Sequence, residues 1–285
     1  MMAILSAKDN EKLFALAERF VLPYEKYCCA LMQRIISHDS SVYLLCEDTT
    51  DKKVQGVFSY NKGRSVFHCL PRCDDAISGA LNSFFAEHHV FCITGERSGT
   101  EFLQKILKSI GKDDEAEVRD YFFMEYRKVN SSDSMSEEIN VKPWQILQCS
   151  ENDADKLMPL QLSYVKEEVL PVSREVNPPA ERIALEQLLR AKKVFVLVQE
   201  GQFVSKVHIN AQSDNVAQLG GTYTVEAKRR NGFASALVRY VSEKMVAEKK
   251  QPVLFVKEKN RSAFHAYERV GFVQVAKYRI VYYED

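Results

Sequence analysis

The chain has 285 residues, which is more than one typical hydrophobic core holds and suits two domains. Hydrophobic residues make up 46% of the sequence, a share that excludes extensive disorder. Lys plus Arg and Asp plus Glu are equal at 39 each. This balance argues against a general electrostatic attraction to nucleic acid or to an acidic membrane surface.

Targeting and metal-binding signals are missing from the sequence. No window approaches the ~18 apolar residues of a membrane span, and Lys8 and Asp9 come too early for a signal peptide. The seven cysteines show neither metal-ligand nor redox-motif spacing. We therefore expect a cytoplasmic protein with reduced thiols, no metal site and no membrane or nucleic-acid partner.

A polar, serine-rich stretch divides the chain. "VNSSDSMSEEIN" separates two apolar, strand-like runs and has no periodicity. We interpret residues 129–140 as a linker between domains at 1–128 and 141–285, both of ordinary domain size.

The N-terminal half predicts a helix over about residues 10–36 and then three strands, "SVYLLCED", "KVQGVFSY" and "SVFHCLP". A helix over 75–88, the strand "VFCITG", a helix over 98–110 and the strand "YFFMEYRK" follow. The C-terminal half predicts the same order of elements, with no repetition of sequence detectable by eye.

In the C-terminal half, "KVFVLVQE" and "QFVSKVHI" form a predicted hairpin, and "NVAQLGGTYTV" is a third strand. Gly220-Gly221 inside this third strand indicates a bulge or a close backbone approach. A helix from 232 to about 249, the strand "PVLFVKEK", and a helix over 261–270 come next. The segment 272–283 is expected to be a strand pair or one long edge strand. The fold class is thus α/β (α+β), with a mixed, mostly antiparallel sheet flanked by helices in each half.

The segment "VEAKRRNGFASALVRYV" carries the clearest functional signal. Basic residues at a helix start are electrostatically unfavourable unless an anion binds there, because the helix N-terminus is itself partly positive. Backbone N–H groups from Arg230 to Ser235 can hold phosphates there, and Gly232 has no side chain to block them. The alternative is an ordinary glycine-led helix start with solvated arginines.

These residues resemble the pyrophosphate loop of the GNAT superfamily of acyl-CoA N-acyltransferases. That loop reads Arg or Gln, two residues, Gly, one residue, then Gly or Ala, and Arg229-Arg230-Asn231-Gly232-Phe233-Ala234 fills every position. The resemblance continues in "NRSAFHAYERVGF", with Asn260, Ala263, Tyr267, Gly271 and Phe272. In element order it spans residues 144–285.

The resemblance implies acetyl-CoA as the acyl donor and an amine as the acceptor. It implies Tyr267 as the general acid that protonates the leaving thiolate, although Tyr267 is equally suited to packing. The strand amides near Thr224 and Val225 would stabilise the oxyanion. The implied CoA contacts are Tyr223, Thr224, Val225, Arg229, Arg230, Asn231, Gly232, Phe233, Ala234, Ser235 and Asn260. Asn260 is also a favoured helix N-cap.

The residue that takes the proton from the amine is left open by the sequence. Glu226 is one candidate base, His208 is another, and deprotonation through water is a third route. Glu167 and Glu168 fall where this family shapes its acceptor pocket, and they are equally compatible with a solvated helix face.

The N-terminal half has no such loop. "PRCDD" stands where the loop would be, and Asp74 and Asp75 would repel phosphate. We therefore expect a degenerate GNAT-like domain that does not bind CoA.

The predicted function is transfer of an acetyl group from acetyl-CoA to a primary amine by direct attack. The acceptor, a small molecule or a protein N-terminus or lysine, cannot be told from the sequence, and a monomer or a homodimer is expected. Two alternatives are a non-catalytic acyl-CoA-binding module and an aminoacyl-tRNA-dependent transferase with tandem GNAT-like domains. The neutral charge and the intact loop argue against the second.

Overall fold

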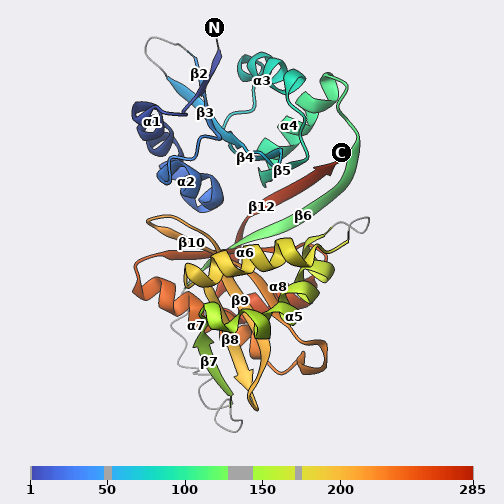
Figure 1. Ribbon diagram of the computed structural model, residues 1–285. Coiled ribbons are helices and arrows are strands. Elements are labelled where there is room, and N and C mark those ends of the chain that lie inside the picture. Colours follow the sequence, from blue (N-terminus) through green and yellow to red (C-terminus); the bar gives the residue numbers. More distant parts are fainter. Residues whose placement is uncertain (1, 48–52, 128–143, 171–174, 285) are drawn as a thin grey trace.

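The computed structural model describes residues 2–47, 53–127, 144–170 and 175–284. The linker predicted at 129–140 lies outside these residues. Within them, twelve strands form one sheet, and helices cover both of its faces (Figure 1).

The N-terminal half provides six strands and four α-helices. In chain order these are β1 Ala3–Ser6, α1 Glu11–Val21, α2 Cys29–Ile36, β2 Val42–Cys46, β3 Val54–Tyr60, β4 Ser65–Cys69, α3 Asp75–Glu87, β5 Cys92–Glu96, α4 Arg97–Ser109 and β6 Glu115–Tyr126. The single helix expected over 10–36 is thus two α-helices, joined by a 3₁₀ turn, η1, at Leu22–Tyr27, where Pro23 removes a backbone donor.

The C-terminal half repeats this order with six strands and four α-helices. They are β7 Trp144–Gln148, α5 Ala154–Tyr164, α6 Pro178–Arg190, β8 Val194–Gln199, β9 Gln202–Gln212, β10 Val216–Thr224, α7 Phe233–Ala247, β11 Gln251–Lys257, α8 Arg261–Val270 and β12 Phe272–Tyr283. A short 3₁₀ turn, η2 at Glu151–Asp153, precedes α5, and a π-helical turn, η3 at Val165–Val169, continues it. Another 3₁₀ turn, η4 at Glu226–Lys228, follows β10.

The order of strands across the sheet is β1-β2-β3-β4-β5-β12-β6-β11-β10-β9-β8-β7. The last strand of the chain, β12, therefore lies between β5 and β6 of the N-terminal half. In return, β6 lies between β12 and β11 of the C-terminal half. The expectation of an edge strand over 272–283 is wrong, because this segment is one strand with a neighbour on each side.

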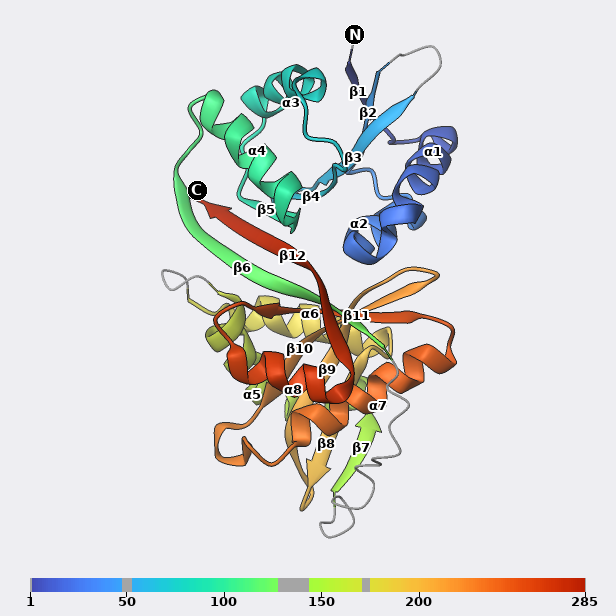
Figure 2. The same cartoon turned by 180° about the vertical axis from the view of Figure 1, so that it is seen from behind.

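The two exchanged strands hold the halves together. β6 and β12 pair antiparallel along their length, from Phe272 opposite Tyr126 to Tyr283 opposite Glu115. Beyond this shared ribbon, β6 pairs with β11 and β12 pairs with β5. Figure 2 shows the ribbon running between the two groups of helices.

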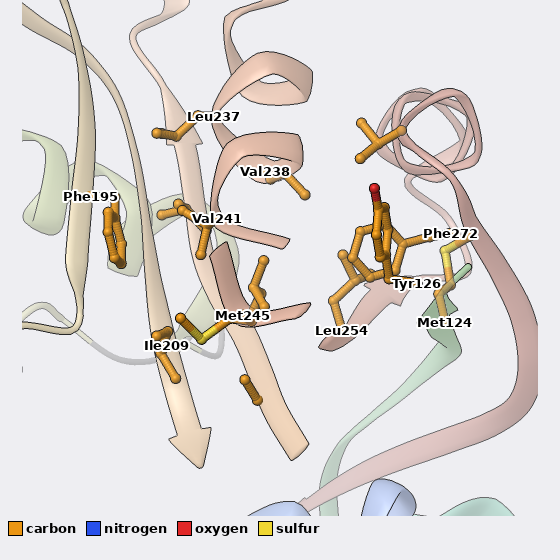
Figure 3. Packing of buried hydrophobic residues seen from close by; sticks show 14 of the residues in the cluster. Met124, Tyr126, Phe195, Ile209, Leu237, Val238, Val241, Met245, Leu254 and Phe272 are labelled. Carbon is orange, nitrogen blue, oxygen red and sulfur yellow. The ribbon is translucent and has the colours of Figure 1, made fainter. Parts of the chain in front are cut away.

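The side chains of the exchanged strands enter the opposite core. Met124 and Tyr126 of β6 pack in the cluster beneath α7 and α8, beside Leu254 and Phe272 (Figure 3). Reciprocally, Val281 and Tyr283 of β12 belong to the cluster beneath α3 and α4. Each half is thus completed by apolar surface from the other, and burial of that surface stabilises both.

Because β11 depends on β6 for one of its edges, we expect residues 141–285 alone to be insoluble or not cooperatively folded. The full chain with a protease site inserted at 129–140 is the matched control. After cleavage, its two fragments should remain associated and give one cooperative unfolding transition. Size-exclusion chromatography and circular dichroism measure both outcomes, and a monomeric, cooperatively folding 141–285 fragment would contradict the prediction.

Candidate active site

Two parallel strands separate at the centre of the C-terminal half. β10 pairs with β11 only over Val216–Leu219, opposite Gln251–Leu254. Past this point β10 stays with β9, whereas β11 stays with β6. The strands therefore diverge toward their carboxyl ends, which is where ligands enter open α/β sheets.

A bulge shapes β10 at this divergence, as the sequence indicates. The pairing of β9 with β10 jumps from Gly220 opposite His208 to Tyr223 opposite Lys206. Gly221 has φ +61°, and a Cβ placed on it would lie 2.0 Å from Cε1 of His208. Both its conformation and the available space therefore require glycine here.

The loop before α7 exposes unpartnered backbone donors. Its N-cap is Gly232, with φ +75° and no side-chain capping bond, and its first turn has no acidic residue. Arg230 also has a positive φ, +66°, so the loop has the alternating backbone conformations of an anion-binding nest. The open N–H groups and the helix dipole favour a phosphate at this point.

The side chains of the loop have different partners. The Arg229 guanidinium turns back to the Thr224 carbonyl at 3.1 Å and to the Glu167 carboxylate at 2.7 Å. The Asn231 amide donates to the carbonyls of Lys228 and Arg229 and so braces the loop. Arg230 is exposed, and its side chain has no hydrogen bond or ion pair among the described residues. Arg230 is therefore the loop's available cation.

The start of α7 is anchored by the side chains after Gly232. Phe233 is buried in the cluster beneath the helix, and Ala234 and Ser235 are half-buried in its first turn. These small side chains leave the backbone of the first turn accessible.

Tyr267 reaches the bulge from α8. Its ring packs against Phe272, and its hydroxyl interacts with the Thr222 side chain. Burial, and then the Glu168 charge, raise the pKa of Tyr267, so its hydroxyl keeps its proton at neutral pH and can donate it. Asn260, seven residues earlier, caps α8 by accepting from the Ala263 amide at 3.0 Å.

The Glu168 charge contributes to the raised pKa values of three tyrosine hydroxyls, those of Tyr121 of β6, Tyr164 of α5 and Tyr267 of α8. The carboxylate pairs with the Lys257 ammonium at 2.7 Å. Its neighbour Glu167 instead accepts from the Tyr223 hydroxyl at 2.7 Å. Of the two carboxylates noted in the sequence, Glu168 is thus the one whose charge acts on the pKa of Tyr267.

A residue of the N-terminal half fixes this segment. Arg119 of β6 donates to the backbone carbonyls of Glu168, Val169 and Leu170, at 3.3, 2.6 and 2.8 Å. The exchange of β6 therefore places part of the N-terminal half beside the C-terminal site. The sequence pattern could not predict this contact, because it depends on the strand order.

The two candidate bases lie in different surroundings. Glu226 is exposed in η4, and no side-chain contact is described for it. His208 is buried behind Gly221, and burial, followed by the nearby lysines, holds its pKa well below the usual value. The Val225 amide donates to the Val204 carbonyl at 2.9 Å. That bond removes Val225 from the expected oxyanion donors.

Lys206 is a site feature that sequence reasoning missed. It is 0% exposed, on the central strand β9. Its ammonium nitrogen lies 3.1 Å from the Gly221 carbonyl oxygen and 4.4 Å from the centre of the Tyr164 ring. Burial lowers its pKa to about 7, and the Glu181 charge partly offsets this effect. The sequence signal is a lysine between Ser205 and Val207 in "FVSKVHI", a run otherwise typical of a buried strand.

The corresponding gap in the N-terminal half is filled. β4 and β5 pair in parallel up to Phe67 and Thr94, and His68 comes next. The His68 ring occupies the space where a Cβ on Gly95 or Gly99 would stand, at 2.1 and 2.6 Å. Asp74 accepts from the Ala76 amide and caps α3 with a negative side chain. The N-terminal half thus has a histidine ring at its strand separation and an acidic cap at its helix start, whereas the space around Gly232 is open.

Comparison with known proteins identifies the architecture. Residues 204–281, from β9 to β12, match the model of the family described as FR47-like protein. A protein from Drosophila has a TM-score of 0.64 at 14% identity, over 99% of this chain and 98% of that one. A GNAT-family acetyltransferase from Colwellia psychrerythraea has 0.59 at 10%, over 99% of both chains. A tandem GNAT protein from the clavulanic acid biosynthesis pathway has 0.59 at 10%, over 99% and 97%.

This chain has a tandem GNAT fold. The full-length coverage by these structures includes both halves and the shared sheet. No curated protein matches the chain. Among the described residues of this tandem GNAT fold, no helix is long and apolar enough to cross a membrane.

The buried Lys206 predicts a specific dependence of stability on pH. Its pKa is about 7 in the folded chain and 10.5 as a free side chain. Between these values the unfolded chain binds more protons, so this group makes stability rise with pH, by up to about 1.4 kcal/mol per pH unit. Lys206→Met should therefore show a smaller rise than the natural chain in urea unfolding at pH 7 and pH 9. Equal rises in the two proteins would contradict the assignment, since all other titrating groups are shared.

Proposed function

We propose that this protein transfers an acetyl group from acetyl-CoA to a primary amine at the separation of β10 and β11. The observation that carries the proposal is the glycine-led, uncapped start of α7 at the mouth of that separation. It brings backbone donors and the Arg230 cation to the end of β10, and the Tyr267 hydroxyl interacts with the Thr222 side chain of the β10 bulge. The FR47-like match over residues 204–281 supports the same assignment.

The donor would be held through three kinds of contact. The pyrophosphate would bind the N–H groups from Arg230 to Ser235, where phosphate charge favours the helix dipole. The pantetheine arm would lie along the β10 edge, at Tyr223 and Thr224, past the last residue that pairs with β11. Asn260 keeps its amide nitrogen for the cofactor, because only its oxygen is used in capping.

The chemistry is one direct displacement. The amine nitrogen attacks the thioester carbonyl carbon, a C–N bond forms, and the C–S bond breaks. Tyr267 gives its proton to the departing thiolate, which a general acid of raised pKa can do because it stays protonated at neutral pH. The proton of the attacking ammonium leaves through Glu168 or through water.

The acceptor would be a cationic amine that meets Glu168. This carboxylate is about one-third exposed, and its charge acts on the hydroxyls of Tyr121, Tyr164 and Tyr267, so an ammonium bound to it would have a charge partner near the proposed acid. An incoming ammonium would compete with Lys257 for the carboxylate. We prefer Glu168 to Glu226 as the acidic residue of the site, because Glu226 lies on an exposed turn outside this group of tyrosines.

One acetyl-CoA should bind per chain, because His68 fills the N-terminal gap. Gly232→Trp should abolish this binding in isothermal titration, since the indole would occupy the phosphate position. Gly201→Trp is the matched control. Gly201 has φ +76° and open space around it, like Gly232, but lies in the β8–β9 turn. Two sites per natural chain, or equal binding by both variants, would contradict the assignment.

Removing the Tyr267 hydroxyl should impair turnover more than donor binding. We expect Tyr267→Phe to lower kcat by roughly 10²-fold, the lower range for loss of a general acid, with the acetyl-CoA Kd changed less than about threefold. Tyr126→Phe is the control, because Tyr126 also packs against Phe272 but lies on β6. Steady-state kinetics with an amine panel and thiol detection give both values. Unchanged kcat in Tyr267→Phe would remove its role as the acid.

A further inference from the structure

We infer that Lys206 is a positioning residue, which orients the backbone of the β10 bulge so that the Thr222 N–H faces the acyl carbonyl oxygen. This inference rests on the proposed function and names the group that would stabilise the oxyanion. It replaces the Val225 amide, which the Val204 carbonyl already occupies.

A side chain of β9 holds the Gly221–Thr222 peptide from beneath. The Lys206 ammonium donates to the Gly221 carbonyl, with 3.1 Å between the nitrogen and the oxygen. Lys206 lies over the Tyr164 ring, so the two side chains form one assembly under the bulge.

This hydrogen bond determines where the next amide points. The carbonyl and the N–H of a trans peptide lie in one plane and point in opposite directions. If the Gly221 carbonyl faces Lys206, the Thr222 N–H faces away from it. Thr222 is the residue that Tyr267 contacts, so this amide and the proposed acid meet at the same residue.

Burying a lysine in order to give one carbonyl a hydrogen-bond donor is unfavourable for folding. Desolvation of an ammonium disfavours folding, so an apolar side chain at this position would favour stability, and a lysine there indicates another use. The cross-strand neighbour of Lys206 on β8 is the apolar Val196. A hydrogen-bond donor that is fixed before the reaction needs no reorganisation in the transition state. A lysine side chain anchored in the strand gives this advantage, and a water molecule does not.

The surroundings allow Lys206 to donate whether or not it is charged. The charged and titratable groups near it are Glu181 on α6, Tyr164 on α5, His208 on β9 and Tyr223, opposite it on β10. Both the ammonium and the neutral amine carry N–H groups, so the contact with Gly221 persists across neutral pH. The orientation of the bulge should therefore depend on the presence of the amine and only weakly on pH.

The test measures the bound thioester directly. In isotope-edited infrared spectra with [1-¹³C]acetyl-CoA, the natural chain should shift the thioester carbonyl stretch to lower wavenumber than in free acetyl-CoA. Lys206→Met should still bind acetyl-CoA but lose most of this shift, and its kcat should fall by roughly 10²-fold, the loss typical for one oxyanion donor. Both effects should be similar at pH 6.5 and pH 8.5.

Val207→Ala is the matched control. Val207 is the next residue of β9 and fully buried, but it packs in the cluster on the α7 face. It should lower the unfolding temperature while keeping the natural infrared shift and kcat. A natural shift in Lys206→Met, or an equal loss in Val207→Ala, would overturn the inference and leave the proposed function standing. Failure of the natural chain to bind acetyl-CoA would overturn both.

Discussion

The antiparallel pairing of β6 with β12 is the interaction on which the rest of this structure depends. It joins two groups of strands into one sheet and makes each half supply a strand to the other. The exchange also explains why the cores are not separate. Met124 and Tyr126 complete the cluster under α7 and α8, and Val281 and Tyr283 complete the one under α3 and α4. A change in the last strand of either half would therefore also disturb the sheet and the core of the other half.

The same exchange connects the halves functionally. Arg119 and Tyr121 stand on β6, next to the π-helical turn that carries Glu168. The N-terminal half thus contributes side chains beside the proposed acceptor position, whereas the ring of His68 stands at its own strand separation. The two halves have the same order of elements but differ at two local positions. Gly220 of the C-terminal half corresponds to His68 of the N-terminal half, and the uncapped start of α7 corresponds to the start of α3, which Asp74 caps.

Much of this could be read from the sequence, and the reasons are local. Hydrophobic periodicity identified the strands and helices, and Gly220-Gly221 indicated the bulge that β10 contains. The loop from Arg229 to Ala234 was recognisable because its chemistry lies in consecutive residues. The strand exchange was not, because the alternation of side chains in 272–283 is the same at an edge and in the interior of a sheet. The sequence does not predict Lys206 for a related reason. Its proposed role depends on the Gly221 carbonyl, fifteen residues away on another strand.

The position of β12 has a consequence for genetics. β12 leaves the C-terminal half at Phe272 and runs into the N-terminal half, where the Tyr283 amide donates to the Phe91 carbonyl and the Glu284 amide to the Asp114 carbonyl. A frameshift or stop codon within the codons for β12 would therefore leave one edge of β5 without its partner and open the core beneath α3 and α4. The mutation would lie in the coding region of the C-terminal half, yet structural damage would appear in the N-terminal half.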